Sequence, residues 1–345
     1  MKIEVELSPV IGVNGILELA RDIDSPYVSR LGISDVAMFL DSYLIQALCT
    51  QATEHVAVGS LVTNPYTRHE SVIASAVNTL AEISGGRAFL GIGVGAGLGA
   101  LGIKQIGAAK HLDATLGRVV RLLRGDSIEF NSSSTEVRAV ELKPKPSFEI
   151  PVVIGTRSRL VCEVAGRWAD AVVVGTRDLS YEGLSRYRQW IGKGLRTSGR
   201  DMSDIEISPR VTICASEDTE LARRSVVLYA AHYLALSEGY QQLLDANQFA
   251  RLKELVSQTQ GWYFEADVVY PKELENIVTD EIIDQFAIAG TPDYCVARIR
   301  ELKDKGFDGV SMNIAAVRRD HRNLQDGLVE CSHHLRNMFS EVYAM

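Results

Sequence analysis

The sequence predicts an α/β protein, and within that class a (β/α)8 barrel, for three reasons. Short apolar runs alternate with amphipathic helical segments over nearly the whole chain, which is typical of a parallel sheet covered by helices. The length of 345 residues is ordinary for one barrel domain. No low-complexity linker divides the chain, so we expect a single domain over residues 1–345.

Four strand–helix units account for the first part of the chain. Strands are expected where apolar residues run together or alternate with polar ones, and helices where they recur every three or four positions. The third helix is expected to be capped at Thr67, because Thr67 and Glu70 have the spacing of a capping box. The expected strands are 2–7, 28–34, 55–61 and 87–93, and the expected helices are 13–22, 42–53, 71–83 and 107–123.

The second part of the chain continues this alternation but contains two insertions. Residues 125–150 have the pattern of a hairpin with a polar tip, and they precede the fifth barrel strand. Residues 218–285 are mostly helical at first and then lose their period, and they precede the eighth strand. We expect this helical insertion to be a substrate lid. The remaining expected strands are 151–154, 171–175, 205–214, 287–290 and 309–314, with helices at 158–168 and 180–197, after Thr291-Pro292, and from Asp320 onward.

A doubly wound sheet is the alternative architecture. Gly97, Gly99 and Gly102 match the spacing of a dinucleotide-binding fingerprint. However, this triplet begins beyond the end of the expected strand, and three strand–helix units precede it. The barrel therefore remains the favoured prediction.

Composition excludes several classes of protein. The net charge is −8 and no basic run occurs, so nucleic-acid binding is not expected. No apolar stretch approaches the ~18 residues of a membrane span, and the N-terminus lacks the features of a signal peptide, so we expect a cytoplasmic protein. The histidines lack metal-ligand spacing, and so do the scattered cysteines, which predicts no metal site. The five cysteines are Cys49, Cys162, Cys214, Cys295 and Cys331.

Polar residues and glycines follow several of the expected strands, where barrel proteins place their sites. Two loops combine glycine, a hydroxyl and arginine beside a helix start: Gly155-Thr156-Arg157 and Gly175-Thr176-Arg177. Backbone amides, hydroxyls and a guanidinium in that position can hold a phosphate, although ordinary helix capping would need the same residues.

Three motifs resemble the bacterial-luciferase-like superfamily: Thr63-Asn64-Pro65-Tyr66-Thr67-Arg68-His69, Ser84-Gly85-Gly86-Arg87 and Leu90-Gly91-Ile92-Gly93. Within it the chain is most similar to enzymes that use the deazaflavin coenzyme F420, such as methylenetetrahydromethanopterin reductases. The resemblance extends from Lys2 to about Asp320. It implies a luciferase-like barrel, a homodimer and a small-molecule substrate.

The resemblance also implies where the cofactor binds. The two Gly-Thr loops would hold its phosphate, and Leu61-Val62 would form a non-prolyl cis peptide whose bulge presses on the ring. The cofactor-binding residues expected on this basis are Ser34, Leu61, Val62, Thr63, Asn64, Gly93, Gly95, Gly155, Thr156, Arg157, Gly175 and Thr176.

Glu6 and Asp35 are the expected catalytic residues, at the ends of the first two strands. A Glu6 carboxyl kept protonated by burial could serve as an acid. At two positions this chain departs from the family: Val36 stands where the family has histidine, and Ala96 stands where it has an acidic residue.

The reaction expected is hydride transfer between the deazaflavin C5 and a C=N, C=C or carbonyl carbon. The alternatives are an FMN-dependent monooxygenase and a non-catalytic cofactor-binding barrel. The sequence does not identify the substrate.

Overall fold

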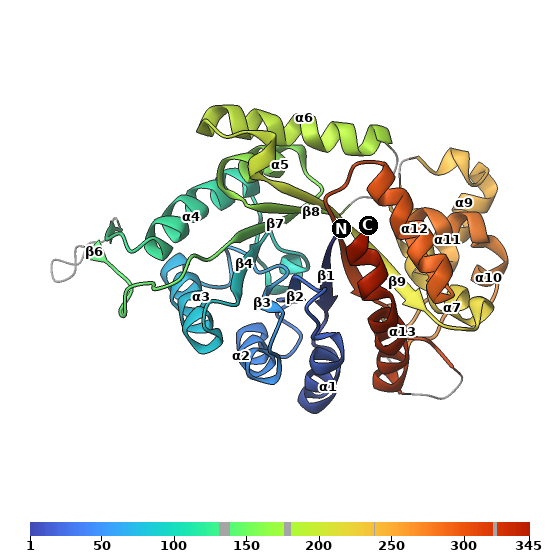
Figure 1. Cartoon of the computed structure of the whole chain (residues 1–345). Helices are drawn as coiled ribbons and strands as arrows, with labels where there is room; N and C mark the ends of the chain where they lie inside the picture. The colour runs from blue at the N-terminus through green and yellow to red at the C-terminus, as the bar shows by residue number, and fades with distance from the viewer. Residues whose placement is uncertain (131–138, 176–180, 238, 266, 320–322) are drawn as a thin grey trace.

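The computed structural model describes residues 1–130, 139–175, 181–237, 239–265, 267–319 and 323–345 (Figure 1). Within these ranges no helix is both long enough and apolar enough to cross a membrane. Thr176, one of the expected phosphate-binding residues, lies outside the described residues.

The described residues form a closed barrel of eight parallel strands, as predicted. The strand order is β1-β2-β3-β4-β7-β8-β9-β11, and β11 pairs with β1 to close the ring. This closure excludes the doubly wound sheet. The barrel strands are β1 (Lys2–Leu7), β2 (Arg30–Ile33), β3 (Ala57–Ser60), β4 (Ala88–Ile92), β7 (Val152–Thr156), β8 (Ala171–Val174), β9 (Glu206–Ala215) and β11 (Gly309–Ile314).

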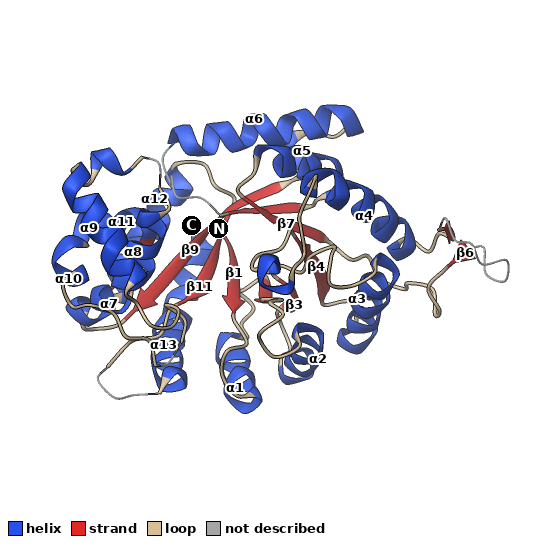
Figure 2. Ribbon diagram, turned by 180° about the vertical axis from the view of Figure 1, so that it is seen from behind, coloured by secondary structure: helices blue, strands red, loops and turns tan. Residues whose placement is uncertain are grey.

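Helices cover the outside of this ring, as the view from behind makes plain (Figure 2). Their buried faces pack on the strand residues that point outward, such as Ile3, Val5 and Leu31, and together these form the main hydrophobic core. The covering helices are α1 (Val13–Ile23), α2 (Ser42–Ala52), α3 (Glu70–Ser84), α4 (Ala108–Leu123), α5 (Arg159–Trp168), α6 (Tyr181–Ser198), α12 (Pro292–Asp304) and α13 (Leu324–Ala344).

Both expected insertions are present. Strands β5 (Ile128–Glu129) and β6 (Ala139–Val140) pair antiparallel in the hairpin, which projects away from the barrel in Figure 1. The second insertion gathers beside β9 and ends in a ninth strand, β10 (Ala287–Gly290), which pairs with β9 outside the ring. Its helices are α7 (Thr219–Ser225), α8 (Val227–Ala235), α9 (Ala246–Ser257), α10 (Leu274–Ile277) and α11 (Asp280–Phe286); short 3-10 turns are η1 (Leu98–Leu101), η2 (Met202–Asp204) and η3 (Tyr240–Gln242).

The strand register divides the barrel interior into two unlike halves. Glu6 pairs with Asn313 on one side and Gly32 on the other, and the same inward row continues through the neighbouring strands. On β3, β4, β7 and β8 this row is apolar or glycine, and Leu61, Phe89, Val153, Ala171 and Val173 form a separate buried cluster. On β1, β9 and β11 it is polar. The mouth of the barrel therefore has one apolar, glycine-rich wall and one charged wall.

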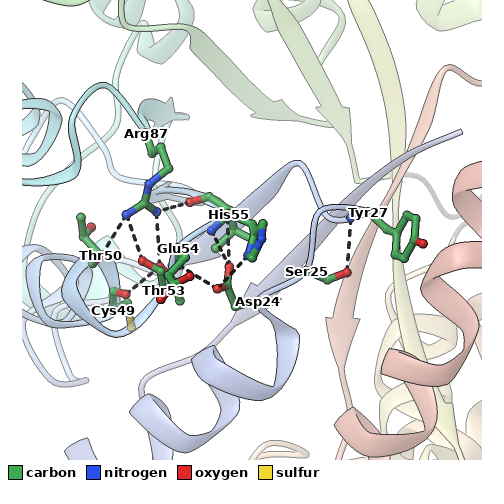
Figure 3. A network of polar contacts seen from close by, with 10 residues as sticks. Asp24, Ser25, Tyr27, Cys49, Thr50, Thr53, Glu54, His55 and Arg87 are labelled. Atoms are coloured by element: carbon green, nitrogen blue, oxygen red, sulfur yellow. Dashed lines mark hydrogen bonds and ion pairs between the residues drawn. The ribbon is translucent and has the colours of Figure 1, made fainter.

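The Ser-Gly-Gly-Arg motif stabilises the opposite, N-terminal end of the strands. Gly85 ends α3 in the left-handed conformation, which glycine adopts without steric cost. The Arg87 guanidinium then donates to the backbone carbonyls of Thr50, Thr53 and Val56 (Figure 3). This motif is thus explained by its place in the fold, far from the site-bearing ends of the strands.

A carboxylate fixes the same α2–β3 connection from the other side. Asp24 accepts hydrogen bonds from the amides of Glu54, His55 and Val56 (Figure 3). Partial burial opposes its ionised form, but the three amide donors outweigh burial, and the pKa of Asp24 lies below its ordinary value.

Candidate active site

The Leu61–Val62 peptide bond is cis, as the resemblance implied. It directly follows β3, and its two side chains diverge. Leu61 packs into the barrel, where a Cβ on Gly32 would lie 2.3 Å from the Leu61 Cβ. Val62 sits between two glycines of neighbouring strands: a Cβ on Gly155 would lie 2.8 Å from one Val62 methyl, and a Cβ on Gly93 3.0 Å from the other. The glycines predicted at these strand ends are therefore the ones that accommodate the bulge.

Thr63 joins the bulge to the end of β2. Its backbone pairs with β4, through Gly91 and Gly93, and its hydroxyl donates to Asp35 Oδ2 at 2.6 Å. The neighbouring Tyr43 carries a phenol whose pKa burial raises to about 12, so it stays protonated near neutral pH. Asp35 and Thr63, both expected in the site, thus form one hydrogen-bonded unit on the glycine-rich side of the mouth.

Asn64 has a role in the loop itself. Its side-chain oxygen accepts from the amides of Tyr66 and Thr67, and its amide group donates to the Thr67 hydroxyl.

The predicted capping box was wrong, because Thr67 forms its hydrogen bonds with Asn64 in this turn. Helix α3 begins three residues later, at Glu70, with His69 as its cap. A Cβ on Gly95 would lie 2.9 Å from the Asn64 Cβ, and the left-handed φ of 81° also favours glycine there.

Glu6 lies inside the barrel and is held by an arginine that sequence reasoning missed. Arg210 of β9 forms an ion pair with both carboxylate oxygens, at 2.8 Å to Oε1 and 2.5 Å to Oε2, and the Ser34 hydroxyl donates to Oε1 at 3.0 Å. Burial disfavours the charge of Arg210, yet the adjacent carboxylate outweighs burial and holds the pKa of Arg210 well above its ordinary value. Glu6 and Arg210 thus form an ion pair inside the barrel, a partner that the expectation for Glu6 from the sequence did not include.

A chain of hydroxyls leads away from this ion pair. Ser34 Oγ lies 3.4 Å from Ser8 Oγ, and Ser8 lines a cavity at the mouth of the barrel. Ser34 is an expected cofactor-binding residue, and its hydroxyl lies between Glu6 and the cavity wall.

The expected phosphate loops lie side by side at the ends of β7 and β8. Gly175 donates its amide to the Thr156 carbonyl, and a Cβ on Gly175 would lie 3.0 Å from the Arg157 side chain. The Thr156 hydroxyl accepts the amide of Ser158, which leaves its hydrogen free to donate. Arg157 is exposed and forms no ion pair with a described carboxylate. A hydroxyl and a free guanidinium at this rim fit a phosphate.

Two separate parts of the second insertion reach the barrel mouth: the α7–α8 junction, with Ser225, Val226 and Tyr229, and the segment around Tyr263. Tyr263 and Phe264 line the same cavity as Arg210, and Phe264 contacts Phe39 of the β2–α2 connection at a ring separation of 5.4 Å. Arg318, after β11, donates to the carbonyls of Tyr263 and Glu265. The expected lid stays a prediction; these two parts of the insertion border the cavity, whereas α9 and α10 lie to one side (Figure 1).

The sequence analysis did not identify two arginines at the barrel mouth, Arg210 and Arg318, although the sequence around Arg210 contains an indication of its position. It interrupts an apolar strand in the alternation Ser208, Arg210, Thr212, which places a charge on the inward row. Arg318 follows β11 without any motif. Across the described parts of the chain, no three His, Cys, Asp or Glu side chains gather in a way that could hold a metal ion.

Comparison with known proteins gives consistent matches. The family model of luciferase-like monooxygenases matches residues 11–309. A 5,10-methylenetetrahydromethanopterin reductase of Methanolobus tindarius is 26% identical over 309 residues, covering 89% of this chain and 92% of that protein. An F420-dependent glucose-6-phosphate dehydrogenase of Mycolicibacterium fortuitum is 28% identical over 192 residues, covering 52% of this chain and 56% of that protein. The structure of the coenzyme F420-dependent tetrahydromethanopterin reductase of Methanopyrus kandleri matches at a TM-score of 0.80 with 20% identity, over 98% of this chain and 99% of that one.

Proposed function

The chain belongs to the luciferase-like monooxygenase family, and from that premise we propose that it is an oxidoreductase using coenzyme F420. The reaction is hydride transfer to or from a C=N, C=C or carbonyl carbon of a small organic substrate. The observation that carries the proposal is the glycine-rich wall beside the Leu61–Val62 bulge, where a flat ring can approach the backbone closely. Relatives whose names state F420 dependence support the choice of cofactor.

The residues present fit this cofactor. Thr156 and Arg157 would hold its phosphate, Val62 would support one face of the ring, and the Asp35–Thr63 unit would meet the ring edge. When bound, the deazaflavin supplies the carbon, C5, that gives or receives the hydride. The protein contributes orientation and a site shielded from water.

Glu6 is the group proposed to handle the proton. Because it is paired with Arg210, the Glu6 carboxylate is placed to accept a proton at Oε1 and return it. The hydroxyls of Ser34 and Ser8 connect Oε1 to the cavity, so a proton can pass between substrate and carboxylate through them.

Cofactor choice is tested by adding F420, FMN and FAD separately to the cofactor-free protein and measuring binding by fluorescence and ultrafiltration. We expect F420 to bind more tightly than FMN. Equal or tighter binding of FMN, with oxygen consumption when a flavin reductase is added, would instead identify a monooxygenase. F420 binding without turnover on any imine, enone or alcohol offered would favour a non-catalytic barrel.

Replacement of Arg157 by alanine is expected to weaken F420 binding by about 1.5–3 kcal/mol, the usual contribution of a hydrogen bond to a charged group. A titration of wild type and variant with F420 measures the difference. Arg159→Ala, two residues further and also exposed, is the matched control and should bind as the wild type does. Unchanged affinity in Arg157→Ala would remove Arg157 from the phosphate site.

We also propose a homodimer that packs α2 against its counterpart. Leu44 and Leu48 lie one turn apart on α2 and are 69% and 40% exposed, next to the exposed Met38 and Leu40. Light scattering at micromolar concentration should give twice the chain mass, and the Leu44→Glu, Leu48→Glu double variant should be monomeric. Leu160→Glu, at an exposed position on α5, should stay dimeric; a monomeric wild type would refute the dimer.

A further inference from the structure

The cavity at the barrel mouth has a distinctive charge. Two guanidinium groups, those of Arg210 and Arg318, line it together with hydroxyls, one amide and apolar side chains. No carboxylate of the described residues belongs to this lining, although the chain as a whole carries a net charge of −8. The cavity is thus locally electropositive in an acidic protein.

The two arginines differ in how their charge is balanced. Arg210 is neutralised by Glu6, with which it shares two hydrogen bonds. Arg318 forms no ion pair with any carboxylate in the described ranges; its Nη2 donates to two backbone carbonyls, those of Tyr263 at 2.7 Å and Glu265 at 2.9 Å. Burial lowers the pKa of Arg318, but an arginine remains charged in proteins.

A half-buried cation without an opposite charge is costly unless a ligand supplies that charge. We propose that Arg318 binds a carboxylate or phosphate group of the substrate, so that the substrate is a small anionic molecule. This inference rests on the proposed function for the reaction, but the binding itself can be measured without it.

The position of Arg318 favours substrate over cofactor as the source of the anion. The loop proposed for the cofactor phosphate follows β7, whereas Arg318 follows β11, and β8 and β9 lie between them in the ring. Tyr263 and Phe264 of the insertion also border the cavity, which suits a small enclosed ligand.

Isothermal titration of the whole protein with benzoate, phenyl phosphate and the uncharged benzyl alcohol tests the site. We expect the wild type to bind the two anions more tightly than the alcohol. Arg318→Gln should weaken anion binding about 10- to 100-fold, whereas Arg318→Lys, which keeps a charge and can still donate to the carbonyls, should lose less. Arg319→Gln is the control, because Arg319 pairs with Glu330 outside the cavity. Anion binding that is no tighter than that of the alcohol, or that is equal in Arg318→Gln and wild type, would overturn the proposal.

The source of the anion is resolved with two deazaflavins, F420 itself and the deazariboflavin that lacks its phosphate and acidic tail. If Arg318→Gln weakens F420 but not the tail-less compound, the anion is the cofactor's, and the assignment to the substrate is refuted. Equal affinity of Arg318→Gln and wild type for both deazaflavins supports the substrate. If F420 fails to bind while Arg318 still binds benzoate, the proposed function fails and the anion site stands.

Discussion

Replacement of Glu6 by glutamine is expected to slow turnover ~10²–10⁴-fold, the usual contribution of a positioned acid or base. Glutamine keeps the shape and one hydrogen-bond acceptor for Arg210 but cannot take up the proton. Affinity for F420 should change little, because Glu6 lies on the charged wall and the cofactor residues lie on the opposite, glycine-rich wall. The measurement is the rate of change of F420 absorbance with a substrate accepted by the wild type, together with F420 binding.

Glu4→Gln is the matched control for this variant. Glu4 lies two residues earlier on the same inward row, is 1% exposed and is paired with an arginine, Arg30, but it stands at the N-terminal end of the strand. We expect Glu4→Gln to lose stability and keep its turnover. A Glu6→Gln enzyme with wild-type turnover would mean that the proton comes from the substrate, from water or from the insertion.

Replacement of Arg210 by methionine is expected to lower the free energy of unfolding by about 3–5 kcal/mol, because it leaves the Glu6 carboxylate buried without its partner. Urea unfolding measures the loss.

Two further variants test whether the unpaired buried charge causes the loss of stability. The double variant Glu6→Gln, Arg210→Met has no unpaired charge and should recover most of the lost stability. Arg251→Met removes only surface ion pairs, with Glu254 and Glu273, and should unfold nearly as wild type does. A single Arg210→Met variant as stable as wild type would show that the ion pair does not matter for folding.

The sequence alone predicted the barrel and the strand ends at which the site is proposed. The alternation of apolar runs and helical periods predicted every barrel strand, because the two periods follow from backbone geometry and differ clearly. The glycines at 93 and 155 and the bulge at Leu61-Val62 could be predicted, the latter through its resemblance to a family, because a local motif fixes them. Residues 259–283 have no clear period in the sequence, although α11 (Asp280–Phe286) begins there, because a helix of two turns is too short to establish a period.

Only the tertiary structure decided how the charged groups combine. Glu6 is separated from Arg210 by more than half of the chain, and no pattern in either strand names the other as its partner; barrel closure brings them together. That contact gives the Glu6 carboxylate a partner of opposite charge, which the sequence did not indicate. Likewise, only the fold places Arg318 at the end of β11 beside the insertion and the cavity. Whether a charged side chain has a partner depends on the residues around it in space, and the residues next to it in the sequence do not reveal this.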